Sequence, residues 1–413
     1  MKLEFFIARR IAGRSYNKGV SSTVVKIAVA AVALSVAVMV VSMSVIIGFK
    51  NDIMDKLVGF GACVNIVNRE SGSNYETLPI DSNQDFYPSV ETEEGIRHIQ
   101  RYVVKPAILK SGADILGVVI KGVGKEYDWS FFNDNLLEGS TFSVTDGAKS
   151  DSILVSKRMA DLLNLSVGSK LVGYFVQDPP RMRKYTVCGI YQTGLEDYDK
   201  LFCFTDMTDI QKLNGWDSNQ ISGFEVMIDD FANLDEMTSL VREYAGYKIA
   251  DDGSMLRVTN VKDNNRQLFD WITLTEMNVW VILGIMFFVA FVNMSTAMLM
   301  IIFERAAMIG IMKAVGSSNW LIRKVFIIQS IYITGRGVII GNIVAALLIL
   351  VEQFFHLVAL DPSSYYVDHV PAEFHFWYFA AIDLATLLIM SIMLVIPSMA
   401  ISRMEPAKVV NFR

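Results

Sequence analysis

Long apolar runs, rather than alternating polar and apolar positions, dominate the pattern of this chain. Four runs exceed the roughly 20 residues that a helix needs to cross a bilayer core about 30 Å thick. They cover residues 27–48, 277–303, 325–351 and 376–401. A core helix of a soluble protein is rarely apolar on every face over such a length. The pattern therefore predicts four transmembrane helices.

The first run has one alternative interpretation, a cleaved signal peptide. It is longer than the apolar part of a signal peptide, and the preceding 26 residues include six Lys or Arg. No small-residue cleavage site follows it, because Val41-Ser42-Met43-Ser44 leads directly into Val45-Ile46-Ile47. We therefore expect an uncleaved membrane anchor.

Lys and Arg residues indicate which side of the membrane each loop occupies. The N-terminal segment, the 304–324 loop and the C-terminal tail are basic, whereas residues 352–375 contain no Lys or Arg. We therefore expect both termini and the 304–324 loop to be cytoplasmic, and residues 49–276 and 352–375 to lie on the other side of the membrane.

The segment 49–276 is long enough to form an independent domain. Short strand-like runs alternate in it with turn residues and helical stretches. Strands are predicted at 63–67, 115–123, 153–155, 184–191, 201–204 and 223–228, and helices at 157–165 and 206–213. The expected fold class is a membrane α-helical protein, with four transmembrane helices and a large inserted α+β extracytoplasmic domain.

These observations divide the chain as follows: a cytoplasmic amphipathic N-terminus (1–23), a first membrane helix (24–48), a periplasmic domain with helical stalks (49–276), a second membrane helix (277–303), a cytoplasmic segment (304–324), a third membrane helix (325–351), a periplasmic loop (352–375), a fourth membrane helix (376–401) and a cytoplasmic tail (402–413).

Both junctions of the inserted domain carry helical apolar stripes. The first stripe comprises Phe49, Ile53, Leu57 and Phe60, and the second comprises Val261, Leu268, Ile272 and Thr275. They predict two helical stalks that continue out of the membrane; an ordinary surface helix at the base of the domain is the alternative. A short amphipathic helix is expected over residues 3–14, lying on the cytoplasmic membrane face.

The composition gives no support for an enzyme. The chain is 52% hydrophobic and 19% charged, with three cysteines and four histidines that lack metal-site spacing. The run from Gly122 to Lys125 resembles a phosphate-binding loop, but Glu126 stands where Ser or Thr would bind magnesium. We therefore expect no catalytic residue, no metal and no cofactor.

Two ionisable residues lie inside the apolar runs, where charge is costly. Arg336 is near the middle of the third run, and Asp383 is about two turns inside the fourth. Their depths differ by about 10 Å, which disfavours a direct pair. Arg336 would face a wet cavity or a lipid headgroup, or else reach a helix carbonyl.

Two cysteines occupy neighbouring strand-like runs. If those strands pair, Cys188 and Cys203 could form a disulfide in an oxidising compartment. We favour buried free thiols over this disulfide.

Several motifs resemble known transporter sequences. Glu304-Arg305, followed by Ile309 to Ser318, resembles the coupling segment of the MacB-like and FtsX-like ABC permease superfamily, and Ala400 to Lys408 resembles its closing signature. In the inserted domain, Gly48-Phe49, the run 153–171 and the run 185–199 are similar to lipoprotein-releasing (Lol-type) permeases. The similarity is collinear over nearly the whole chain.

The resemblance implies a non-catalytic permease that extracts lipoproteins from the outer leaflet of a bacterial inner membrane. Its expected partners are two copies of a separate ABC ATPase, a second permease (the same chain or a paralogue), lipoprotein substrates, a periplasmic carrier and membrane lipids, with no nucleic acid. Residues implied in ATPase coupling are Glu304, Arg305, Ile309, Gly310, Lys313, Gly316, Ser318, Arg403 and Pro406.

Burial of an acyl chain contributes ~0.8 kcal/mol per CH₂, so a protein that extracts acyl chains from the membrane needs an apolar groove to hold them. We expect this groove between the first and second membrane helices, where methionines and aromatic residues could repack around variable chains. Plain helix packing is the alternative for part of the set, and Met390 on the fourth helix is expected to be peripheral. The groove candidates are Met39, Met43, Ile46, Ile47, Phe49, Phe269, Trp271, Ile272 and Trp280.

Two other functions share this organisation. One is an FtsX-like transmitter that signals to a cell-wall hydrolase, which typically has a smaller external domain. The other is a MacB-like efflux permease, which often has a fused ATPase. In one type of Lol permease, a long hairpin captures the carrier; only Phe175 to Lys184 occupies that place here, so carrier capture by this chain stays open.

Overall fold

The computed structural model describes residues 20–72, 75–144, 150–246, 253, 255–361, 365–399 and 401. The predicted helix at 3–14 and the tail with Arg403 and Pro406 lie outside these residues. The chain forms two compact units. We call them the helical unit (Met1–Lys50, Trp271–Ala359 and His369–Arg413) and the sheet domain (Asn51–Asp270 and Leu360–Asp368).

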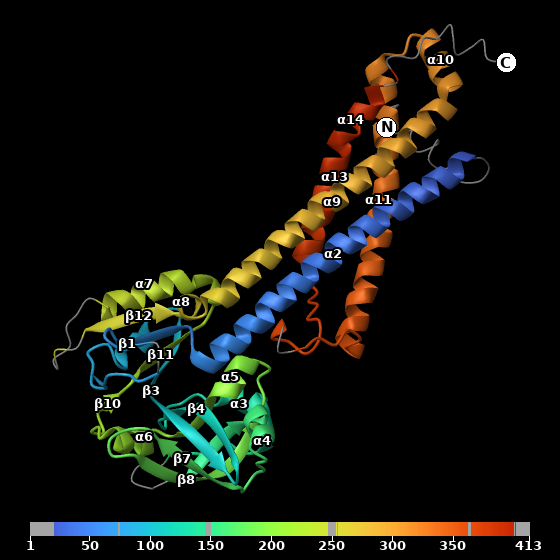
Figure 1. Cartoon of the computed structure of the whole chain (residues 1–413). Helices are drawn as coiled ribbons and strands as arrows, with labels where there is room; N and C mark the ends of the chain where they lie inside the picture. Colours follow the sequence, from blue (N-terminus) through green and yellow to red (C-terminus); the bar gives the residue numbers. More distant parts are fainter. Residues whose placement is uncertain are drawn as a thin grey trace. The chain divides into compact units, whose positions relative to one another are not determined.

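Among the described residues, four helices are long and apolar enough to cross a membrane. They are shown in Figure 1: α2 (Val20–Gly61), α9 (Arg266–Glu304), α11 (Asn319–Phe355) and α13 (Phe376–Met393). Helices α2 and α9 run without interruption past the ends of their apolar segments. The short helix α10 (Ala306–Ala314) lies between α9 and α11, and α14 (Val395–Ser398) follows α13.

Two of the helix ends that differ from the sequence-based boundaries have a clear local cause. Helix α11 begins at Asn319, earlier than the expected residue 325, because the Ser318 side chain accepts a hydrogen bond from Leu321 N and caps it. Helix α13 ends at Met393 rather than continuing to 401. Pro397 lies four residues later, and its ring would clash with the Met393 carbonyl in a continuous helix.

Two glycines bring the backbones of α11 and α2 close together. A Cβ on Gly337 would lie 2.7 Å from Val32 Cβ, and one on Gly341 would lie 2.7 Å from the Ala33 carbonyl oxygen. This is the small-xxx-small spacing by which membrane helices approach closely. We call this contact the glycine seam.

The sheet domain contains twelve strands among the described residues: β1 (Val64–Asn68), β2 (Ile80–Asp81), β3 (Ile96–Ser111), β4 (Asp114–Val123), β5 (Leu136–Gly139), β6 (Ser152–Ser156), β7 (Lys170–Phe175), β8 (Arg181–Tyr191), β9 (Phe202–Asp206), β10 (Gln220–Ile221), β11 (Gly223–Ile228) and β12 (Leu256–Asn260). Its helices are η1 (Ser89–Thr92), α3 (Ser130–Asp134), α4 (Lys157–Leu162), α5 (Glu196–Leu201), α6 (Met207–Asn214), η2 (Phe231–Asn233), α7 (Leu234–Ala245) and α8 (Val261–Asn264).

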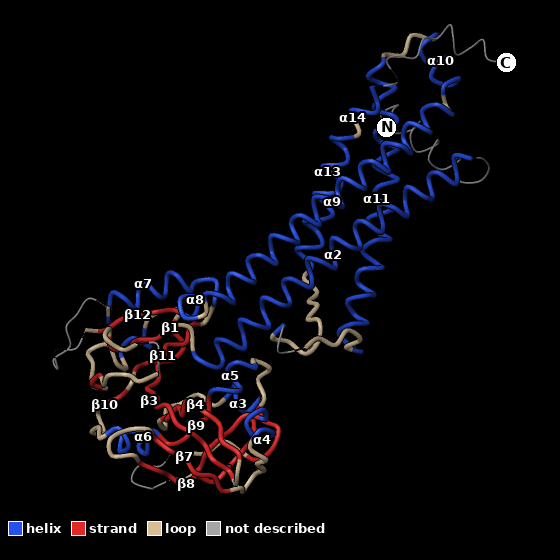
Figure 2. The backbone as a smooth tube through the Cα atoms, in the orientation of Figure 1, coloured by secondary structure: helices blue, strands red, loops and turns tan. Residues whose placement is uncertain are grey.

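Ten of the strands form one mixed sheet in the order β12-β1-β11-β3-β4-β9-β6-β8-β5, with β7 paired to β3 and β8. The long strand β3 connects its two parts, because its first half pairs with β11 and its second half with β4 (Figure 2). Helix α7 packs along β12 and β1 (Figure 1). The inserted domain expected from the sequence is therefore present.

The two cysteine strands do not pair. Strand β6 lies between β8, which carries Cys188, and β9, which carries Cys203. Both residues are free thiols, and burial raises the pKa of Cys188 to about 11. The disulfide alternative is therefore wrong, and the two thiols are inert at neutral pH.

Candidate functional site

Aromatic and charged contacts join α2 to α9 near one end of the helical unit. Phe49 and Trp271 meet edge to face with ring centroids 6.4 Å apart. One residue further along α2, the Lys50 ammonium lies 2.8 Å from the Glu276 carboxylate. Two groove candidates are therefore in contact here, beside an ion pair that the sequence did not reveal.

The other groove candidates differ in exposure. Met39 and Ile46 are buried in the core of the helical unit, against which Met43 and Ile47 pack as half-buried residues. Ile272 is also buried. These side chains line the packed side of α2 and α9 within the described chain.

Two candidates lie apart from that group. Trp280 is 67% exposed on α9. Phe269 stacks on Phe231 of the sheet domain, with ring centroids 6.3 Å apart, and belongs to that unit. Met390, expected to be peripheral, is in fact buried in the helical core. The expectation for Met390 was wrong because the apolar composition of α13 does not show which face packs.

Gly48 has no room for a side chain. A Cβ there would lie 1.9 Å from the Pro371 carbonyl oxygen, in the segment before α13. The same segment is held to α2 by a hydrogen bond from Ser44 Oγ to the Glu373 carbonyl. The glycine of the Gly48-Phe49 motif is therefore a close-approach position between α2 and this segment.

Replacing Gly48 with alanine is expected to destabilise the full-length protein by about 1–3 kcal/mol, because backbone atoms must move to relieve the clash. The thermal unfolding midpoint in detergent measures this. The matched control is Gly284→Ala on α9, where a Cβ meets nothing within 4 Å. That change is expected to be neutral or slightly stabilising, and equal midpoints for both variants would contradict the prediction.

The predicted coupling segment forms α10 and the turn after it. Ile309 and Gly310 face the helical core and are buried. Lys313 Nζ donates to the Ile401 carbonyl at 2.7 Å. Gly316 has a φ of +92°, which suits glycine, and Ser318 caps α11.

Exposed apolar side chains cover the opposite face of α10. Ile311 is 61% exposed and Val315 is 82% exposed. Glu304 is exposed and Arg305 is half-buried at the end of α9. The predicted residues Ile309 and Gly310 therefore position this helix, and the sequence analysis missed the two residues that α10 presents outward.

The intramembrane carboxyl group has a partner on α11. Asn342 Nδ2 donates to Asp383 Oδ2 at 2.6 Å. We did not expect Arg336 and Asp383 to pair directly, and the hydrogen-bond donor beside Asp383 is the side-chain amide of Asn342. This contact links α11 to α13 through half-buried polar groups.

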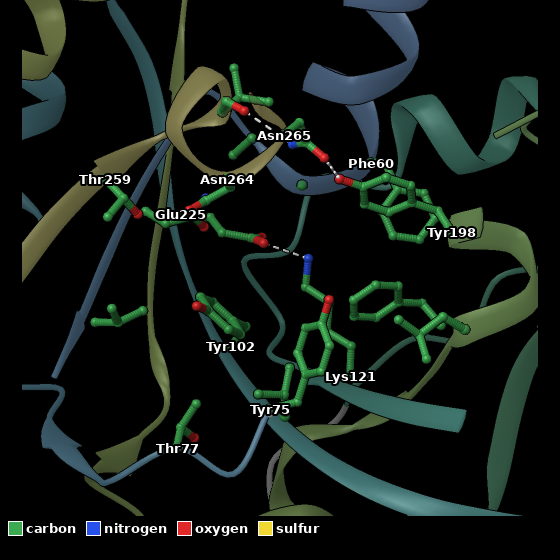
Figure 3. Close-up of a pocket in the computed structure, with 18 of the residues that line it drawn as sticks. Phe60, Tyr75, Thr77, Tyr102, Lys121, Tyr198, Glu225, Thr259, Asn264 and Asn265 are labelled. Carbon is green, nitrogen blue, oxygen red and sulfur yellow. Dashed lines mark hydrogen bonds and ion pairs between the residues drawn. The ribbon is translucent and has the colours of Figure 1, made fainter. Parts of the chain in front are cut away.

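The sheet domain contains a cavity of about 800 Å³. The last turn of α2, residues of β1, β3, β4, β11 and β12, and the start of α5 and α8 line it. Figure 3 shows aromatic side chains and a charged pair gathered around it. The labelled lining residues are Phe60, Tyr75, Thr77, Tyr102, Lys121, Tyr198, Glu225, Thr259, Asn264 and Asn265.

An ion pair lies at the floor of this cavity. Lys121 Nζ is 2.6 Å from Glu225 Oε1, and both side chains are about 95% buried (Figure 3). Gln100 Nε2 donates to the second carboxylate oxygen of Glu225 at 2.9 Å. The rings of Tyr102 and Tyr127 lie 5.5 and 5.4 Å from the ammonium, so cation–π attraction adds to the pairing.

Asp199 forms hydrogen bonds to earlier residues of the motif at residues 185–199. Its carboxylate accepts hydrogen bonds from Thr193 Oγ1 at 2.7 Å, Thr193 N at 3.1 Å and Gly194 N at 3.3 Å. The neighbouring Tyr198 hydroxyl donates to Asn265 Oδ1, next to α9. The motif therefore holds the turn before α5 and ties α5 to the residues that precede α9.

Burial raises the pKa of Asp199 to about 6, against the hydrogen bonds from Thr193 and Gly194 and the nearby Lys56 ammonium. The folded chain therefore holds a proton that the unfolded chain releases between about pH 4 and pH 6, so Asp199 makes stability fall as pH rises through this window. We expect Asp199→Asn to gain about 2–3 kcal/mol relative to wild type from pH 4 to pH 7. Thermal unfolding of both proteins across this range measures the difference; a constant difference would contradict it.

The molecule is thus a membrane protein with four candidate spans and a large domain inserted between the first two. The profile of the MacB-like periplasmic core domain matches residues 27–244, and that of the FtsX-like permease C-terminal domain matches residues 280–406. The first match covers more than half of the chain, which therefore belongs to the family with the MacB-like periplasmic core domain.

Relatives match over the full length. The chain is 22% identical to the lipoprotein-releasing system transmembrane protein LolC of Neisseria meningitidis serogroup B, over 99% of both chains. It is also 22% identical to LolE of Haemophilus influenzae, over 100% of both. The periplasmic region of MacB from Actinobacillus actinomycetemcomitans aligns with 53% of this chain and 97% of its own, with a TM-score of 0.34 and 14% identity. The resemblance drawn from the motifs is confirmed.

Proposed function

We propose that this chain is a permease subunit of an ABC transporter that extracts lipoproteins from the inner membrane for delivery to a periplasmic carrier. The observation that carries the proposal is the full-length similarity to lipoprotein-releasing system transmembrane proteins, over 99% of both chains. ATP would be hydrolysed by a separate ATPase in two copies, and a second permease would complete the complex.

Helix α10 supplies the docking surface for the ATPase in this proposal. Its inner face is anchored by Ile309 and Gly310, and its outer face presents Ile311 and Val315. A small amphipathic helix with an exposed apolar face suits a groove on a partner protein. Movement of the ATPase would then reach α9 and α11, which flank α10 in the chain.

Helices α2 and α9 would carry this movement to the sheet domain, because both extend without interruption beyond their apolar segments. The acyl-chain groove would lie along the packed side of α2, at Met39, Met43, Ile46 and Ile47, and would open where α2 meets α9. Extraction of acyl chains costs on the order of tens of kcal/mol at ~0.8 kcal/mol per CH₂, which accounts for the need for ATP.

The proposed orientation places α10 in the cytoplasm and the sheet domain in the periplasm, following the Lys and Arg distribution. After Cys63, Cys188 and Cys203 are replaced with alanine, a cysteine at Asp361 is expected to react with an impermeant thiol reagent added to intact spheroplasts. A cysteine at Ser317 should react only after lysis. Reversed labelling would overturn the orientation.

Depletion of the chain tests the function itself. Lipoproteins destined for the outer membrane should accumulate in the inner membrane, as measured by membrane fractionation. A plasmid copy of the wild-type chain should restore sorting. Normal lipoprotein sorting together with a cell-separation defect would instead favour the FtsX-like signalling role and remove the transport proposal.

A further inference from the structure

Polar side chains from five neighbouring strands lie in a row on one face of the sheet. Thr259 of β12 is the register partner of Asn65 of β1, and Asn65 is the partner of Glu225 of β11. Gln100 of β3 continues the row, and Lys121 of β4 pairs with Glu225. Buried polar and ionic groups cost desolvation energy that apolar residues of similar volume would not. This row therefore indicates a role beyond stability.

Hydrogen-bonding capacity remains unused at the cavity. Within the described part of the chain, the Lys121 ammonium makes one hydrogen bond, although lysine carries three donors. The Tyr102 hydroxyl makes none among the described residues, although the side chain is more than nine-tenths buried. Burial also raises the pKa of Tyr102, so the hydroxyl stays neutral and can donate. The cavity floor therefore offers free donors next to the Glu225 carboxylate.

The charges around the cavity balance. Lys121 and Arg257 oppose Glu225 and Asp197 among its lining residues. A charged ligand would lose its hydration without gaining a net opposite charge, so an uncharged ligand is favoured. Adjacent donors and acceptors match the N–H and C=O of a peptide unit. The volume of about 800 Å³ falls within the range for drug-sized ligands, a size that fits a few residues.

The position of the cavity adds a second argument. Leu57 and Phe60, in the last turns of α2, line one side, and Asn264 and Asn265, immediately before α9, line another. The Tyr198 hydroxyl bonds Asn265 at this edge (Figure 3). A ligand in the cavity would therefore contact the sheet-domain ends of both long helices.

We propose that this cavity binds a short, uncharged, extended polypeptide segment of the transported substrate. This inference rests on the proposed function, because a lipoprotein supplies a polypeptide beside its acyl chains. Lys121 and Tyr102 donate to peptide carbonyls, Glu225 accepts from a peptide N–H, and Tyr75 and Tyr198 contact its side chains.

Site-specific photocrosslinking tests the proposal with the full chain in lipid nanodiscs. The probe is an N-acetylated hexapeptide of alternating Ser and Gly, with a C-terminal biotin amide. p-Benzoylphenylalanine at Tyr75 should capture this peptide. The matched control is the same substitution at Tyr174 on β7, which is equally exposed at 39% and lies outside the cavity; it should capture little.

A double variant tests whether the polar residues of the cavity floor are responsible for peptide capture. The double variant Lys121→Met/Glu225→Met replaces the ion pair with apolar residues of similar size, a change that a fold tolerates well. Peptide capture at Tyr75 should fall about tenfold or more in this variant. If this variant fails to fold, Asn65→Leu provides a milder change with the same expected direction. Equal capture at Tyr75 and Tyr174, or capture unaffected in a folded floor variant, would overturn the proposal. Stronger competition by a trimer of N-acetylglucosamine than by unlabelled peptide would also overturn it, in favour of a sugar site.

A parallel measurement separates this inference from the proposed function. A photocrosslinker at Met43 with a diacylated lipopeptide reports on the membrane groove alone. Lipid capture at Met43 without peptide capture at Tyr75 would remove only the peptide site. Peptide capture at Tyr75 without lipid capture at Met43 would support the peptide site while removing the groove on which the transport proposal relies.

Discussion

Placing an aspartate at Val315 is expected to abolish co-purification of the partner ATPase while the chain stays folded. Val315 is 82% exposed at the end of α10, so the substitution disturbs no internal packing. In the complex, however, the carboxylate would be buried in a partner groove, at a cost of several kcal/mol. Ile311→Asp, one turn earlier, should have the same effect. Affinity purification of the detergent-solubilised complex measures the loss.

The control is the same change at Val176, a valine of the sheet domain with 78% exposure. Val176→Asp should leave the ATPase complex intact. A stable ATPase complex with both Val315→Asp and Ile311→Asp would show that α10 is not the docking helix. Deletion of Gly310 to Lys313, which removes about one turn, should also prevent association.

Replacing Ile47 with glutamate should block lipoprotein release. Ile47 packs as a half-buried residue against the core of the helical unit, and a carboxylate beside acyl chains costs several kcal/mol unless it is neutralised. Release of a purified lipoprotein from proteoliposomes, in the presence of ATP and carrier, should fall to background. Ile47→Met should be tolerated, because the two side chains have similar volume.

Photocrosslinking locates the groove independently. A photoreactive residue at Met43 should capture lipoprotein, and capture should fall when ATP is added. The control belongs at Leu388, which is 54% exposed on α13, rather than at the buried Met390. Equal capture at Met43 and Leu388, or normal release by Ile47→Glu, would move the groove away from α2.

The sequence predicted the long apolar helices and half of the strands, because their patterns are local, but it missed domain helices such as α7 (Leu234–Ala245). Apolar length predicted the four candidate spans, and β11 (Gly223–Ile228) lies where the sequence placed it. The longest strand, β3, was missed. It contains Arg97, Gln100 and Pro106, residues that normally disfavour a central strand. Partners distant in the chain compensate, since Gln100 bonds Glu225 and β3 pairs on both sides.

The sites were harder to predict than the fold. Sequence reasoning found the α10 segment through its motif but could not tell its buried face from its exposed face. It did not single out Lys121, because its partner Glu225 is about a hundred residues away in the chain. Asn342 and the glycine seam were missed for the same reason. Their roles depend on which helices pack together, which apolar composition does not specify.

The glycine seam divides the helical unit into contacts of unequal strength. At Gly337 and Gly341, α11 lies so close to α2 that main-chain atoms are within contact distance. Separating the two helices there would lose many dispersion contacts. Between α2 and α9, the bulky Phe49 and Trp271 meet instead, and these can swing to new rotamers. If acyl chains enter the proposed groove, α11 would therefore stay packed against α2 on one side, and the contact between α2 and α9 would be the one that opens.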